Sequence, residues 1–108
     1  MADDLYVHYL GVLCRVALDP SLTVYLEYSN EVWNSQFQQT QYAQAEGLAL
    51  GLHSSPWHAG WLYYSQRSVE VFEVFSNSYN QPHDRNLVRV LAGQSVNPWV
   101  NNQIMDWQ

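Results

Sequence analysis

Asn30 and Glu31 are the residues whose types and position are best suited to chemistry. They follow a run of β-branched and aromatic residues at positions 23–28 and stand shortly before Trp33. The Glu31 carboxyl group can take up or release a proton, and the Asn30 amide can donate and accept hydrogen bonds. A loop carboxylate can also cap the next helix or stay solvated. The sequence leaves both interpretations of Glu31 open.

The histidines and the cysteine show no spacing typical of a metal centre. The four histidines are His8, His53, His58 and His83. His53 and His58 are separated by a Ser-Ser-Pro turn, which matches no known ligand spacing, so surface or loop histidine is the simpler interpretation. Cys14 is the single cysteine, which excludes an internal disulfide and fits a small core residue. We therefore expect neither a metal nor another cofactor.

Hydrophobic spacing predicts the elements that position these residues. The expected order is a helix over residues 4–17, a strand over 23–28, a helix from about residue 35, a long helix opened by Ser55-Pro56, a strand over 87–94, and a helix opened by Asn97-Pro98. A polar loop is expected over residues 77–86. Two strands joined by a helical crossover form a βαβ unit, whose strands are expected to be parallel.

Each of the first three predicted helices has an apolar side. In the first, it comprises Leu5, Tyr9, Val12 and Val16, opposite a stripe of Asp4, His8, Gly11 and Arg15. In the second, it comprises Phe37, Gln41, Ala45, Leu48 and Leu52, with Gly51 near the end of the helix. In the third, it comprises Trp57, Trp61, Tyr64, Val71 and Phe75. The helical period supports all three assignments.

The stretch from Val24 to Asn34, Val-Tyr-Leu-Glu-Tyr-Ser-Asn-Glu-Val-Trp-Asn, resembles the large clan of (β/α)₈ glycoside hydrolases whose fourth strand ends in Asn-Glu. The resemblance continues to residues 89–94, which are similar to the next barrel strand. It covers nearly the whole chain, but only about a quarter to a third of a typical barrel. It implies a helix-rich α/β fold, a βαβ slice of a TIM barrel, forming a single domain over residues 1–108.

In that clan, the residue matching Glu31 is the general acid/base and the residue matching Asn30 holds the sugar 2-hydroxyl. Retaining hydrolysis needs a second carboxyl group about 5 Å away, and the clan's nucleophile lies on a later strand with no counterpart among these residues. Glu27 is about 13 Å down the same predicted strand, and Glu70 and Glu73 fall mid-helix. The resemblance thus implies a glycan-binding protein that is catalytically incomplete as a single chain.

Trp33, Trp99 and Gln94 are further candidates for contact with a sugar. Either Trp can be a stacking platform, or instead a buried or interface aromatic. Gln94 ends the second predicted strand on the rim where barrel enzymes place binding groups, although a turn hydrogen bond would also explain it.

Composition excludes several classes of partner. The net charge is −6, with ten acidic residues against four arginines and no lysine, which argues against nucleic acid and against an anionic membrane surface. Neither a signal peptide nor an apolar run long enough to span a bilayer is visible, so we expect a cytoplasmic protein.

A two-stranded slice leaves both strand edges unpaired, which favours self-association. We therefore expect a homo-oligomer, most simply a dimer, or a chain that repacks as a mostly helical dimer. The alternative function is a non-enzymatic homo-oligomeric interaction module derived from a barrel fragment. Strand alternation also places Glu27 and Arg89 on one face, where we expect them to form a structural ion pair.

Overall fold

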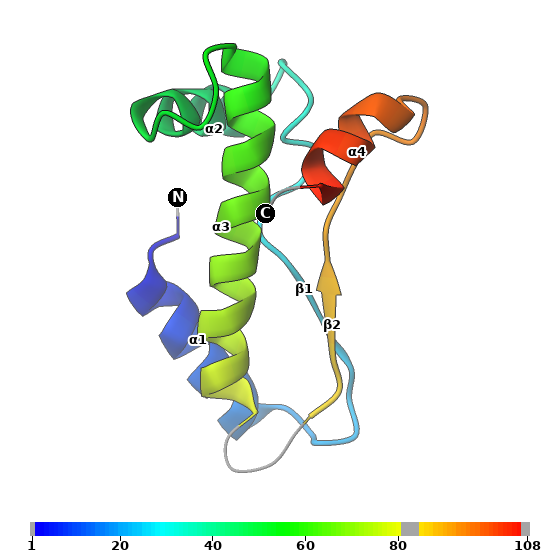
Figure 1. Ribbon diagram of the computed structural model, residues 1–108. Coiled ribbons are helices and arrows are strands. Elements are labelled where there is room, and N and C mark those ends of the chain that lie inside the picture. Colours follow the sequence, from blue (N-terminus) through cyan, green and yellow to red (C-terminus); the bar gives the residue numbers. More distant parts are fainter. Residues whose placement is uncertain (1, 81–84, 107–108) are drawn as a thin grey trace. The chain divides into compact units, whose positions relative to one another are not determined.

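The computed structural model describes residues 2–80 and 85–106. Over these residues the chain is a helix-rich α/β protein with four helices and two parallel strands. The elements are α1 (Asp4–Ala17), β1 (Val24–Glu27), α2 (Gln38–Ala49), α3 (Pro56–Tyr79), β2 (Leu87–Val90) and α4 (Pro98–Met105), as Figure 1 shows. The predicted order is confirmed, with two helices between the strands. None of these helices is both long and apolar enough to cross a membrane.

The helix ends follow from capping residues that are visible in the sequence. Asp3 caps α1, its carboxylate accepting a hydrogen bond of 2.8 Å from the Tyr6 N–H. The Asn97 side chain accepts from the Val100 N–H at the start of α4, where Pro98 occupies the first turn. Gly51, just past the end of α2, has φ +68°, a conformation that glycine adopts without a steric penalty. These residues mark helix ends in the sequence, which is why the positions of the helices could be predicted from it.

The chain divides into two compact units. The first comprises Met1–Leu26 and Val69–Val90, and the second comprises Glu27–Ser68 and Leu91–Gln108. The first therefore holds α1, the second half of α3 and nearly the whole sheet. The second holds α2, the first half of α3, α4 and the segments that follow the two strands. The expectation of a single domain stays a prediction.

The sheet has two strands in the order β1-β2. Both are shorter than predicted, four residues each, and α3 runs to Tyr79, into the region where a loop was expected; His83 lies outside the described residues. Alternation holds along β1, where Leu26 is buried while Tyr25 is 72% exposed. β1 thus has one covered and one open side, as the alternation predicts, whereas no residue of β2 is fully buried.

In the first unit, α1 packs with the side opposite to its apolar row. Its buried residues are Val7 and Gly11, and the Gly11 backbone lies close to Phe75 and Ser78 of α3. The His8 Nδ1 and the Ser78 Oγ are 2.7 Å apart, within hydrogen-bond distance. The amphipathic pattern predicts this helix correctly but does not identify its buried side, because a glycine permits a closer helix contact than large side chains do.

In the second unit, α2 shows the same reversal. Its buried residues are the small side chains Thr40, Ala43 and Gly47, whereas Leu48, on the predicted apolar side, is 42% exposed. The Gly47 backbone meets the Ala59 backbone of α3, so close that no Cβ would fit between them. Along α3, by contrast, Trp61 and Tyr64 are buried, in agreement with the predicted apolar side.

Candidate functional site

Asn30 and Glu31 lie in a tightly hydrogen-bonded loop that follows β1. Glu31 has φ +49°, the one positive φ of a non-glycine residue over the described residues. Its Oε2 accepts from the Asn34 Nδ2 at 3.1 Å, and its carbonyl oxygen accepts from the Asn34 N–H at 2.8 Å. The Asn30 carbonyl oxygen accepts from the Gln39 Nε2 at 3.0 Å. The loop holds Glu31 in a left-handed backbone conformation that costs free energy for a residue with a Cβ.

The loop is anchored on the core of the second unit. This core comprises the buried residues Val32, Ala43, Trp61, Tyr63, Tyr64, Val100 and Ile104. Val32, beside Glu31, is 4% exposed, and Trp33 is partly buried and packs against the same cluster. Trp33 therefore contributes to packing, which is the second of the two roles considered for it, and Val32 fixes the loop that carries the carboxylate.

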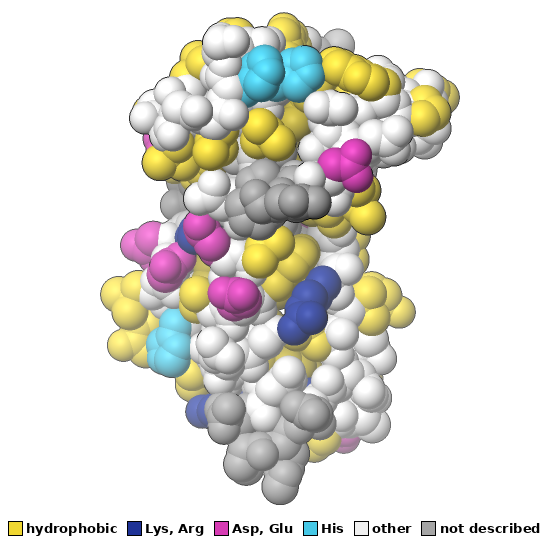
Figure 2. Space-filling view, in the orientation of Figure 1, with side chains coloured by type: hydrophobic (Ala, Val, Ile, Leu, Met, Phe, Trp, Pro, Cys, Tyr) yellow, Lys and Arg dark blue, Asp and Glu magenta, His cyan; other side chains and the backbone are white. Residues whose placement is uncertain are grey.

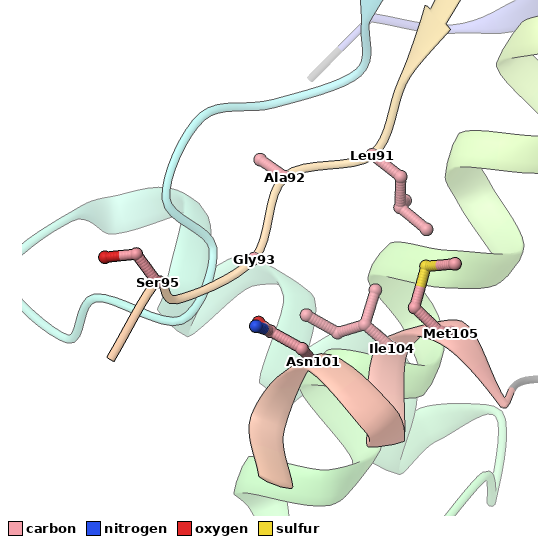
Figure 3. A pocket seen from close by; sticks show the side chains of 7 residues that line it. All are labelled: Leu91, Ala92, Gly93, Ser95, Asn101, Ile104 and Met105. Atoms are coloured by element: carbon pink, nitrogen blue, oxygen red, sulfur yellow. The ribbon is translucent and has the colours of Figure 1, made fainter. Parts of the chain in front are cut away.

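The segment after β2 and the helix α4 enclose a pocket of about 300 Å³. Leu91, Ala92, Gly93 and Ser95 line it from the segment, and Asn101, Ile104 and Met105 line it from α4 (Figure 3). The Asn101 Oδ1 accepts a hydrogen bond of 2.8 Å from the Gln94 N–H, which holds the segment against the helix. The Gln94 carbonyl oxygen accepts from the Asn97 N–H, so the Gln94 backbone makes the turn that the sequence suggested as an alternative.

Trp99 lies in an aromatic cluster at the start of α4. Its ring is 51% exposed and meets the rings of Trp61 and His58 edge to face, with centroids 5.3 and 5.0 Å apart. His58 also stacks on His53, with ring centroids 4.5 Å apart, and Figure 2 shows two histidine side chains next to each other. The Trp61 Nε1 is buried and has no hydrogen-bond partner among the described residues. Trp99 thus has a half-exposed ring held by rings beneath it, the property required of a stacking platform.

Buried tyrosine side chains contribute to the packing and hydrogen bonding of the second unit. The Tyr64 hydroxyl accepts from the Ala92 N–H at 2.9 Å, and the Tyr64 ring stacks with Tyr28 at 6.2 Å. Burial raises the pKa of Tyr64, Tyr28 and Tyr63 above the usual value for a phenol. These hydroxyls therefore remain neutral near pH 7, and the Tyr64 hydroxyl serves as a hydrogen-bonding group, not as a base.

The expected ion pair of Glu27 and Arg89 stays a prediction. Glu27 belongs to the second unit and Arg89 to the first. Within its own unit, the Arg89 Nη2 donates to the Ser76 Oγ at 3.1 Å. Sequence reasoning did not anticipate this contact with α3.

No group of three or more metal-ligating side chains occurs over residues 2–80 and 85–106. The site candidates named from the sequence, Asn30, Glu31, Trp33, Gln94 and Trp99, all belong to the second unit. Two residues at this pocket were not predicted from the sequence. They are Asn101, whose side-chain amide binds the Gln94 N–H, and Tyr64, whose hydroxyl binds the N–H of the lining residue Ala92. The one available signal was the spacing of Asn101 four residues after the helix-capping Asn97, which places both on one side of α4.

No family model, curated protein or solved structure matches this chain.

Proposed function

We propose that this chain is a carbohydrate-binding relative of the barrel glycoside hydrolases, built as a βαβ slice of such a barrel. The parallel strand pair with its helical crossover is what such a slice requires. The segments that follow both strands, where the resembled barrels bind sugar, belong to one compact unit. The proposal accounts for the position of Asn30 and Glu31 directly after β1.

The observation that carries the proposal is the backbone of Glu31. A glutamate at φ +49° is held there by the Asn34 side chain and the buried Val32, although a glycine would adopt this conformation at lower cost. Non-glycine residues with a strained backbone cluster at functional sites. Their conformation lowers stability and persists only where the surrounding structure enforces it. A carboxylate aimed by its loop fits the acid/base role that the resemblance implies.

Sugar contact is assigned to the exposed ring of Trp99, with the Asn30 amide as a hydrogen-bonding group. Aromatic rings bind the C–H faces of sugars, and an amide satisfies hydroxyl groups. Gln94 is placed beside the pocket by its backbone and is the third candidate. The resemblance offers no counterpart in this chain for the clan's nucleophile, so the proposed activity is binding without turnover.

Titration of the purified protein with β-linked oligosaccharides, followed by tryptophan fluorescence, tests this function. We expect saturable quenching that is lost in Trp99→Ala and retained in Trp57→Ala, because Trp57 is similarly exposed, at 44% against 51%, but lies outside the aromatic cluster. If the fluorescence of the wild-type protein shows no saturable change with any oligosaccharide, the proposal is wrong.

Hydrolysis is tested separately on a panel of aryl β-glycosides. We expect no turnover above that of Glu31→Gln. Turnover that disappears in Glu31→Gln would instead show that a second carboxylate is supplied from outside this chain.

The second candidate is a non-enzymatic homo-oligomeric module. The two-stranded sheet favours it, since Tyr25 is 72% exposed on the open face and an exposed strand edge invites pairing. Under this function, oligosaccharides leave the fluorescence unchanged while self-association persists.

A further inference from the structure

The side of α1 that faces away from α3 carries a row of large apolar side chains. Leu5, Tyr6, Tyr9, Leu13 and Val16 are between 60% and 75% exposed. At 3.6 residues per turn they fall within an arc of about 100°. None of the five is charged, and we call this row the α1 apolar face. Figure 2 shows hydrophobic side chains along the outer side of α1.

The packing of α1 within the first unit keeps this face outward. On the opposite side, a Cβ added at Gly11 would lie 2.7 Å from the Ser78 Cβ and 3.1 Å from the Phe75 carbonyl oxygen. The His8–Ser78 contact fixes the same rotation of the helix. Turning the apolar row inward would force a ring or a leucine into a space that admits only glycine. The chain therefore cannot bury this face with its own α3.

We propose that the α1 apolar face is the interface between two copies of this chain. With typical residue areas, the five exposed fractions amount to about 600 Å² on each copy. Two copies would then bury about 1,200 Å², which reaches the lower limit of stable protein interfaces. Leu10 and Val12 flank the row and are half-buried, so they extend the interface further.

Charge is compatible with a second copy as the occupant. Each copy carries a net charge of −6, and like charges oppose association least where two copies meet through an uncharged surface, which this face is. An antiparallel arrangement opposes the two helix dipoles, which favours it over a parallel one. A membrane-surface helix needs lysines or arginines on its polar side, where α1 has Asp4 and a single arginine.

This inference is independent of carbohydrate binding, because the α1 apolar face lies in the first unit and the proposed sugar site in the second. Sedimentation equilibrium at tens of micromolar tests it. We expect a wild-type dimer whose dissociation constant rises at least about 30-fold in Tyr9→Glu. The control is Val96→Glu, in the second unit, where Val96 is 83% exposed; its dissociation constant should stay within about threefold of wild type.

If Tyr9→Glu loses the circular-dichroism signal of its helices, the variant is unfolded and its dissociation constant says nothing about the interface. Cross-linking then tests the interface in folded protein. In a Cys14→Ser background, oxidation of mixed Leu5→Cys and Val16→Cys copies should yield disulfide-linked dimers joining the two variants. A monomeric wild-type protein, an equal effect of Val96→Glu, or no mixed disulfide would overturn the proposal. Monomeric protein that co-sediments with phosphatidylcholine vesicles would overturn it in favour of a membrane surface.

Discussion

Glu31 combines a carboxylate with a left-handed backbone, and substitution separates these two properties. In Glu31→Gly, relief of a left-handed cost of about 1–2 kcal/mol offsets the loss of a hydrogen bond worth about 1 kcal/mol, so the free energy of unfolding should change by under about 1 kcal/mol. Glu31→Val loses the Asn34 bond and places a β-branched residue at φ +49°, so it should destabilise by about 2 kcal/mol. Urea unfolding measures both.

The control for this pair is Tyr25→Val, within β1, where the side chain is 72% exposed and a β-branched residue fits the strand. We expect its free energy of unfolding to stay within about 0.5 kcal/mol of wild type. If Glu31→Val costs no more than Tyr25→Val, the loop does not hold the strained conformation in solution.

The sequence could predict the position of Asn30 and Glu31 but not their geometry. A run of β-branched and aromatic residues followed by polar ones predicts a strand end. Nothing in a glutamate indicates a positive φ, since glycine and asparagine are the usual signals. The hydrogen bond from the Gln94 N–H to Asn101 likewise depends on how α4 meets the segment after β2, which no local pattern contains.

At the scale of elements, the helices α1 and α2 show why hydrophobic pattern and burial can differ. Both place a glycine against α3, Gly11 in the first unit and Gly47 in the second. Small residues let helix backbones approach closely, and many weak atomic contacts then offset the apolar area left outside. A hydrophobic row identifies the apolar side of a helix, whereas its buried side also depends on which neighbours the fold supplies.

Gly47 and Gly51 give a matched test of close approach against backbone conformation. A Cβ at Gly47 would collide with the Ala59 backbone, so Gly47→Ala should destabilise by about 2–3 kcal/mol. A Cβ at Gly51 meets nothing within 4 Å, so Gly51→Ala should cost only the left-handed strain of about 1 kcal/mol. Thermal and urea unfolding of both variants check the order. Equal effects would mean that α2 and α3 do not pack this closely.

At the scale of the whole molecule, the order of elements was predictable because proline, asparagine and glycine mark the ends of the helices. Ser55-Pro56 and Asn97-Pro98 each open a helix where expected. The division into two units was not predictable, because both halves of α3 carry buried aromatic residues, such as Tyr64 and Phe75, and the sequence gives no boundary between them.

The buried tyrosines of the second unit make the stability of the molecule sensitive to alkaline pH. Burial raises the pKa of Tyr28, Tyr63 and Tyr64, so above pH 10 the folded chain binds more protons than the unfolded chain. Stability is then fully present below about pH 10 and falls as the pH rises, by up to about 1.4 kcal/mol per pH unit for each tyrosine. Tyr63→Phe removes one such group and should move the midpoint of alkaline unfolding to higher pH.

Absorbance at the phenolate band, recorded with circular dichroism, separates ionisation from unfolding. At least three of the eight tyrosines should ionise only as the helical signal is lost. Tyr25→Phe is the control, because Tyr25 is 72% exposed and lies outside the group of buried tyrosines, so the midpoint should not move. Reversible ionisation of all eight tyrosines with the helical signal intact would mean that water reaches the core around Tyr64.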